Sequence, residues 1–220
     1  MLGMVKVGQF YSPKEEFCNS LTHLMGMLFS VCALSVLVTL SCFYADAWAI
    51  VSCSIFGASM FLAYAASTAY HVAWSPRLKA LMKKFDHIAI YYLIAGSYTP
   101  FLLVPMRSGL AWWIFGIIWA LAITGTMLKI FSGASGTKFW SIALYLAMGW
   151  LIVFVSGRLF SCISATAIVF LVLGGLFYSG GVVFYLKKDK MYYHAIWHIF
   201  VLMGTIMHFF AVLFSCVLEV

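Results

Sequence analysis

The chain has 220 residues, of which 65% are hydrophobic and 9% are charged. Soluble globular domains carry roughly 25% charged residues, so this composition cannot cover a water-facing surface and excludes a soluble fold. The formal net charge is +7, but the basic residues form short clusters between apolar runs. There is no basic stripe interleaved with aromatic residues, which argues against a nucleic-acid partner.

The apolar runs reach membrane-spanning length, and no polar linker divides them. The sequence therefore predicts an all-α integral membrane protein, a single seven-transmembrane helix bundle at 15–220 that follows a short N-terminal tail at 1–14. The first apolar run is too long for the hydrophobic part of a cleavable signal peptide, so we interpret it as the first span. The predicted spans are 16–43, 47–74, 85–104, 110–131, 139–156, 162–186 and 191–218. Turns are expected at 44–46, 105–109 and 157–161, a basic loop at 75–84, a flexible loop at 132–136 and a charged loop at 187–190.

The positive charges divide unequally between the two sides of this topology. One side carries Lys6, Lys14, Arg77, Lys79, Lys83, Lys84, Lys129, Lys138, Lys187, Lys188 and Lys190, and the other carries only Arg107 and Arg158. Because lysine and arginine concentrate in cytoplasmic loops, this split places the N-terminus in the cytoplasm and the C-terminus outside.

The six cysteines are scattered, with no C-x-x-C pair, and are expected to be small apolar residues of the helices. Four of them fall near one side of the predicted topology, so an oxidised pair there stays open, although the sequence cannot say which residues would pair. These four are Cys42, Cys53, Cys162 and Cys216.

Several histidines are expected at one depth, near the cytoplasmic ends of their helices. His194 and His198 stand four residues apart at the start of the last span, so they share one helix face, about 6 Å apart at Cβ. His71 lies at the cytoplasmic end of the second span, four residues after Ser67, and Asp86 lies at the start of the third span. The sequence thus brings three histidines and one aspartate, from three helices, to the same level of the membrane.

These residue types predict a zinc site. Three neutral imidazoles, from His71, His194 and His198, would leave a tetrahedral zinc ion with one open position, which is the pattern of catalytic sites. Zinc lowers the pKa of water in that position to about 7 and makes it a nucleophile. Asp86 is the candidate general base and acid. Ser67 could orient His71 or donate a hydrogen bond to a developing oxyanion.

Each of these residues also has a plainer interpretation. Asp86 could be only the N-cap of the third span, and Ser67 and His71 could be an ordinary satisfied pair near a helix end. His87, about 100° around the helix from Asp86, is expected at a helix interface, and His208, about 15 Å beyond His198, is expected outside the cluster. A further polar group on the first two turns of the first span is either a capped helix start or a support or mouth for the site. This group consists of Glu16, Asn19, Thr22 and His23.

Four motifs follow one another along the chain. They are Glu16-x-x-Asn19-x-x-Thr22-His23, then Ser67-x-x-x-His71, then Phe85-Asp86-His87 leading to Ile94-Ala95-Gly96-Ser97-Tyr98-Thr99-Pro100-Phe101, and His194-Ala195-Ile196-Trp197-His198. With these motifs the sequence resembles the bacterial hemolysin III family, which is related to the progestin and adipoQ receptors and, more distantly, to the alkaline ceramidases.

The resemblance implies a seven-helix protein of the bacterial inner membrane with its N-terminus in the cytoplasm. In the wider family, zinc is held by three histidines that match His71, His194 and His198. The aspartate that matches Asp86 contacts the water on the metal, and the serine that matches Ser67 lies close by. Relatives have been linked to hydrolysis of ceramide-like amides, and the bacterial branch takes its name from lysis of red cells.

The leading hypothesis from the sequence is a zinc-dependent hydrolase whose substrate is a membrane lipid amide or ester, reached between the helices near the cytoplasmic leaflet. A second hypothesis is a non-enzymatic sensor or adaptor in which zinc only joins the second span to the seventh. A third is a lytic pore, although no charged aqueous lining is evident in the sequence. The substrate and the oligomeric state stay open.

Overall fold

The computed structural model describes residues 11–131 and 138–219, and every regular element in these two ranges is helical. The expected flexible loop at 132–136 and most of the expected N-terminal tail lie outside them. The elements are α1 Pro13–Tyr44, α2 Ala47–Val72, α3 Pro76–Leu103, α4 Gly109–Phe131, α5 Lys138–Trp150, the 3₁₀ helix η1 Leu151–Val155, α6 Ser156–Phe160, α7 Ala165–Leu186, α8 Tyr193–Leu213 and the π-helical turn η2 Phe214–Leu218.

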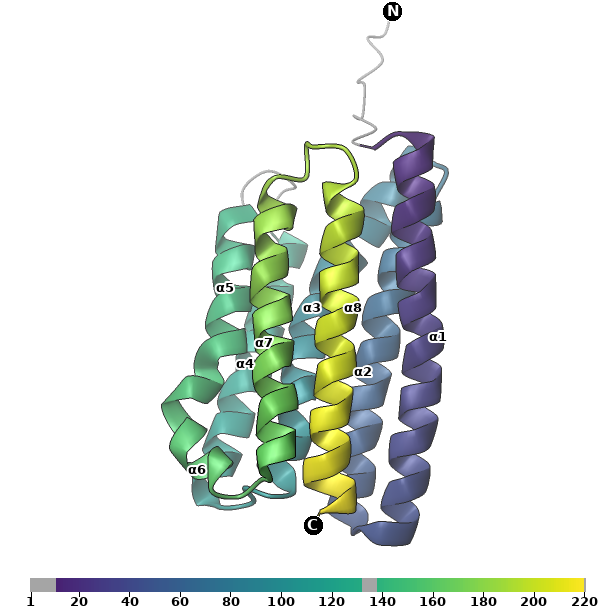
Figure 1. Cartoon of the computed structure of the whole chain (residues 1–220). Helices are drawn as coiled ribbons and strands as arrows, with labels where there is room; N and C mark the ends of the chain where they lie inside the picture. The colour runs from purple at the N-terminus through teal and green to yellow at the C-terminus, as the bar shows by residue number, and fades with distance from the viewer. Residues whose placement is uncertain (1–10, 132–137, 220) are drawn as a thin grey trace, which may run out of the picture.

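The helices form one bundle of roughly parallel and antiparallel rods (Figure 1). Six stretches of the described residues are long and apolar enough to cross a membrane: α1, α2, α4, the run 139–160 from α5 to α6, α7, and α8 with η2. The seventh long helix, α3, is more polar and lies among the others, where its last nine residues are all buried. The predicted all-α, multi-pass membrane fold is confirmed. The side on which each terminus lies stays a prediction.

Short polar side chains set most of the helix starts. Ser12 caps α1, and its hydroxyl and the Glu15 carboxylate bond each other's backbone N–H in a capping box, so α1 begins at Pro13, before the predicted start at residue 16. Asp46 caps α2 through the Ala49 N–H at 3.0 Å, directly after the predicted turn. Caps of this kind stabilise a helix by about 1 kcal/mol each.

The predicted basic loop at 75–84 is wrong, because these residues form the first turns of α3. Ser75 is the N-cap and Pro76 occupies the first turn. Backbone N–H groups in the first turn have no partner within the helix, so proline, which lacks this group, loses no hydrogen bond there. Lysine and arginine end an apolar run, but they are good helix formers and do not end a helix. Asp86 is therefore well inside α3, and the alternative that it caps the helix is excluded.

The predicted fifth span is also wrong in detail, because it is a broken helix. After α5, the chain passes through η1 into α6, so residues expected to turn at 157–161 are mostly helical. The hydroxyl of Tyr98 on α3 inserts at the break. It lies 2.7 Å from the Met148 carbonyl and accepts a hydrogen bond from the Ile152 N–H at 2.9 Å. An inserted side chain is a known cause of such helix distortions.

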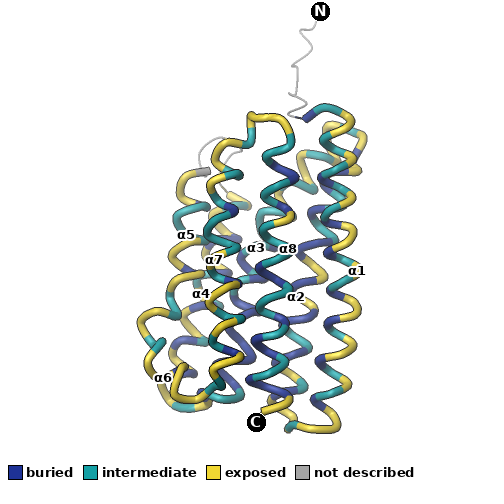
Figure 2. Tube along the Cα trace, in the orientation of Figure 1, coloured by how far each residue is buried: buried dark blue, intermediate teal, exposed yellow. Residues whose placement is uncertain are grey.

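Burial follows the positions of the helices in the bundle. The buried residues concentrate on the inward faces of α2, α3 and α8, whereas the outward faces expose large apolar side chains (Figure 2). An outer surface of this kind faces lipid and not water. All six cysteines lie in the described ranges and are free thiols, so the structure contains no oxidised pair.

Candidate metal centre

Three histidines from two helices meet near the end of the bundle where α1 begins. His71 is on the last turn of α2, and His194 and His198 are on the first turns of α8. One ligand nitrogen from each lies within 4.8 Å of the other two. All three side chains are buried, with exposed fractions of 4%, 7% and 2%. The predicted His71, His194 and His198 therefore come together in the fold.

The donor atoms suit a zinc ion. The Nε2 atoms of His194 and His198 lie 3.1 Å apart, close to the separation of about 3.3 Å that two nitrogens have on a tetrahedral zinc. The Nε2 atom of His71 is buried and makes no hydrogen bond to any described residue. Buried polar atoms are normally satisfied, so an unpaired nitrogen beside two others fits a metal ligand.

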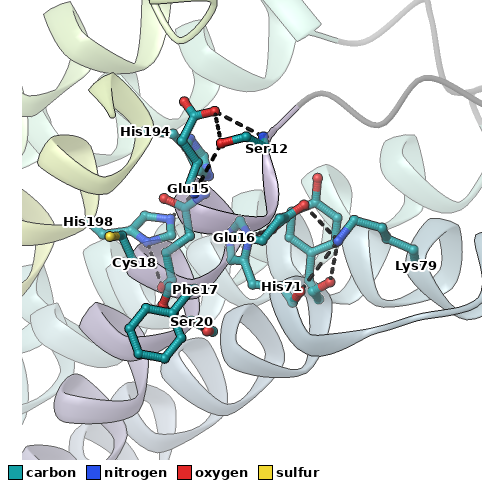
Figure 3. A network of polar contacts seen from close by, with 12 residues as sticks. Ser12, Glu15, Glu16, Phe17, Cys18, Ser20, His71, Lys79, His194 and His198 are labelled. Atoms are coloured by element: carbon teal, nitrogen blue, oxygen red, sulfur yellow. Dashed lines mark hydrogen bonds and ion pairs between the residues drawn. The ribbon is translucent and has the colours of Figure 1, made fainter. Parts of the chain in front are cut away.

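Glu16 orients His71. Its Oε2 atom accepts a hydrogen bond from Nδ1 of His71 at 2.6 Å, which leaves the lone pair of that ring on Nε2, facing the other two histidines (Figure 3). Lys79, on the first turns of α3, makes an ion pair with Glu16 Oε1 at 2.8 Å. The same ammonium group contacts the carbonyls of Tyr70 and His71 at the end of α2, at 3.3 and 3.5 Å.

His198 is oriented in a similar way by α1. Its Nδ1 atom lies 3.2 Å from the backbone carbonyl of Asn19 and 3.2 Å from Oγ1 of Thr22. A donor at Nδ1 again leaves Nε2 free to face the centre. Glu16 therefore contacts the Nδ1 atom of His71, and Asn19 and Thr22 contact that of His198.

His23 lies deeper than a site mouth. Its ring packs on that of His198, with centroids 3.6 Å apart, and lies in a T-shaped arrangement with the ring of Tyr64, with centroids 5.2 Å apart. Both of its nitrogens are buried without a hydrogen-bond partner among the described residues. It is not in the group of three whose donor atoms converge.

Tyr11, just before α1, covers the centre. Its ring stacks on that of His194 with centroids 4.8 Å apart, and the residue is only 5% exposed. Burial, together with the nearby Tyr70 and Tyr185, raises the pKa of the Tyr11 phenol well above its usual range. The phenol therefore stays neutral and closes the site with an uncharged, largely apolar surface.

A cavity of about 270 Å³ opens beside the centre and runs between α2, α3, α5, α7 and α8. His194 and His198 line it, together with Ser67 and Asp86. Ser67 is buried and its hydroxyl makes no hydrogen bond to a described residue, so Glu16, and not Ser67, orients His71. Most of the remaining lining is apolar.

His87, expected at a helix interface, also lines this cavity. Its Nδ1 atom donates to the Lys83 carbonyl at 2.6 Å, and its Nε2 atom lies 3.4 Å from the Tyr185 hydroxyl. Asp86 and His87 both line the cavity, although they are neighbours in sequence.

Sequence reasoning missed two residues of the site, Tyr11 and Lys79. For Lys79 a signal was present, since Ser75-Pro76 is a typical helix start and places the lysine one turn into α3. For Tyr11 there was none, because a lone aromatic residue before a helix has many roles.

Comparison with known proteins identifies the family of this chain. The family model described as "Haemolysin-III related" matches residues 11–209. The chain belongs to this family. Among haemolysin-III-related proteins, it is 43% identical over 207 residues to the Hemolysin-3 homolog of Bacillus subtilis (strain 168), which covers 94% of this chain and 97% of the relative. Hemolysin-3 of Bacillus cereus is 42% identical over 211 residues, covering 96% and 95%.

A more distant haemolysin-III relative is the human Monocyte to macrophage differentiation factor. It is 31% identical over 209 residues, covering 90% of this chain and 83% of the relative. The family resemblance predicted from the four motifs is confirmed, and the protein is a multi-pass membrane protein in contact with the lipid bilayer.

Proposed function

We propose that this haemolysin-III-related protein is a zinc-dependent hydrolase that cleaves an amide or ester bond of a membrane lipid. The observation that carries the proposal is the position of the three converging histidines at one end of a largely apolar cavity. Asp86 and Ser67 line the same cavity. A cavity of this volume and character suits an acyl chain.

Each residue has a role that follows from its contacts. His71, His194 and His198 would hold the zinc ion, and Glu16 and the Asn19 carbonyl would keep two of the rings in the required tautomer. When bound, zinc supplies a Lewis acid that activates water and polarises a carbonyl group.

The Asp86 carboxylate takes a proton from the attacking water and returns it to the leaving nitrogen or oxygen. The free hydroxyl of Ser67 donates a hydrogen bond to the developing negative charge on the substrate carbonyl oxygen. Tyr11 covers the histidines at the end of the bundle and restricts the access of bulk water. The balanced reaction consumes one water and yields a carboxylic acid and an amine or alcohol.

The test is to purify the protein in nanodiscs and measure bound zinc and the release of fatty acid from ceramide-like amides and from esters. The wild type should bind about one zinc ion and release fatty acid. His194→Ala should lose the metal, and Asp86→Asn should keep it with turnover reduced by 10²-fold or more, because general acid-base catalysis supplies that much. A wild type that binds no zinc at neutral pH without a chelator would refute the proposal.

A second candidate is a non-enzymatic sensor or adaptor in which zinc is structural. The burial of all three histidines, with Tyr11 packed on His194, favours it, because a buried ion is shielded from bulk water. The Asp86→Asn variant separates the two candidates. Under the structural alternative, zinc binding and thermal stability are unchanged, and neither wild type nor variant releases fatty acid from any lipid offered.

A lytic pore, the third reading of the sequence, has less support. The cavity lining is mostly apolar and includes few charged side chains, all toward the end that holds the histidines. Measurement of ion flux through liposomes that contain the pure protein would revive this reading if it detected conductance.

A further inference from the structure

A second polar site lies deep in the bundle, around a histidine that the proposed chemistry does not use. His208 is ten residues beyond His198 on α8, about 15 Å further along the helix. Both nitrogens of its ring are inaccessible to solvent, and neither makes a hydrogen bond of good geometry to a described residue. The backbone carbonyl of Leu171 on α7 also faces this ring. An ionisable side chain inside an apolar span is costly and calls for a functional explanation.

The surrounding helices are shaped to hold this ring. Gly174 on α7 faces His208 so closely that a methyl group there would overlap the imidazole. Gly204 on α8 faces the ring of Tyr178, with ring carbons 3.0 Å from the position of an added Cβ. Tyr178 in turn meets His208 edge to face, with centroids 5.3 Å apart. Two glycines on facing helices therefore make room for two polar rings.

Beside His208, three hydroxyl groups form a network in which each already donates a hydrogen bond. Thr205 Oγ1 donates to the Val201 carbonyl at 3.0 Å, so it accepts from the hydroxyls of Tyr64 and Tyr178, each at 2.7 Å. Both phenol protons are then committed. The phenol oxygens keep lone pairs, and the two ring nitrogens of His208 are the atoms of the group that lack a hydrogen bond of good geometry.

His208, Tyr178 and Tyr64 line the same cavity as His194 and His198. We propose that this deep group recognises a hydroxyl carried by the acyl chain of the bound lipid. A neutral imidazole offers one donor and one acceptor, and a hydroxyl group is the small polar group that offers the complementary pair. An unsubstituted chain would offer the ring no partner besides the Leu171 carbonyl. The inference rests on the proposed function only in that the cavity takes an acyl chain. It does not require zinc or turnover.

The experiment measures binding of dodecanoic acid and of its ω-hydroxy derivative to the full chain in nanodiscs, by displacement of a fluorescent fatty acid, with empty nanodiscs as the blank. Because the hydroxyl also costs desolvation, the comparison is made between variants and not between ligands. His208→Leu should weaken binding of the hydroxylated acid about tenfold, the effect of one buried hydrogen bond, and leave dodecanoic acid unchanged.

Two further variants serve as controls. His208→Gln keeps a donor and an acceptor and should retain most of the hydroxyl-dependent affinity. Gly116→Ala adds a methyl group on α4, away from the cavity and where nothing lies within 4 Å, and should change neither ligand. The inference is overturned if His208→Leu changes the binding of both acids equally or changes neither. The second result is expected if a water molecule already bonds the ring nitrogens. Failure of both acids to bind the wild type would overturn it too, while zinc content and lipid turnover would still decide the proposed function.

Discussion

At the scale of single residues, the chemistry of the centre is set by atoms that face away from it. His71 and His198 present Nε2 because Nδ1 of each is engaged, by a carboxylate in one case and by a backbone carbonyl in the other. The sequence could predict the three histidines, since their spacing and helix positions place them at one depth. It could not assign the orienting contacts, because these join residues 55 and 179 positions apart.

Replacement of Glu16 tests this orientation. Glu16→Gln keeps the size of the side chain but weakens the hydrogen bond to His71 and the ion pair with Lys79. We expect a loss of zinc affinity of about 10- to 100-fold, as is usual for groups that orient a ligand. The measurement is competition with a chelator of known affinity.

The matched control for this variant is Glu15→Gln. The Glu15 carboxylate bonds Ser12 and the Tyr192 N–H but no histidine. This change should therefore alter zinc affinity by less than about twofold, far less than the loss expected when a group that orients a ligand is replaced. Equal losses in the two variants would show that zinc affinity depends on the negative charge at the start of α1 and not on the hydrogen bond to His71.

At the scale of elements, the close approach of α7 and α8 depends on glycine. Glycines in the sixth span could be recognised from the sequence as sites of close packing, but not which side chain each one accommodates. In the structure Gly174 faces His208, whereas the next residue, Gly175, faces open space. Although the two glycines are neighbours in sequence, a side chain would be accommodated only at Gly175.

This pair gives a direct test of the helix packing. Gly174→Ala should destabilise the protein by about 1–3 kcal/mol, because the added methyl group overlaps a ring held between two helices. Gly175→Ala should be neutral or slightly stabilising, since alanine favours helix. Thermal unfolding in detergent provides the comparison, and His208→Ala in the Gly174→Ala background should recover most of the loss.

At the scale of the whole molecule, length and composition were enough to predict the all-helical membrane bundle, and the seven long helices lie close to the predicted spans. The errors occurred where a helix continued beyond its apolar part, as at Pro76–Lys84 in α3, and where a neighbour's side chain broke one, as Tyr98 does after α5. Hydropathy measures contact with lipid, so it does not detect helical turns in water or contacts between helices.

The orientation of the bundle stays a prediction from its charges. A fluorescent protein fused to the C-terminus should stay dark, and alkaline phosphatase at the same position should be active, because the predicted topology places that end outside the cytoplasm. The opposite pair of results would reverse the orientation, and would move the histidine centre to the outer leaflet without altering its geometry.

The packing of Tyr11 on His194 has a practical consequence for all of these measurements. Tyr11, the first described residue, stacks on one of the three histidines proposed to hold zinc. An oligohistidine purification tag at the N-terminus would bring further imidazoles toward that site and disturb the measurement of bound zinc. Affinity tags therefore belong at the C-terminus, at the opposite end of the bundle (Figure 1).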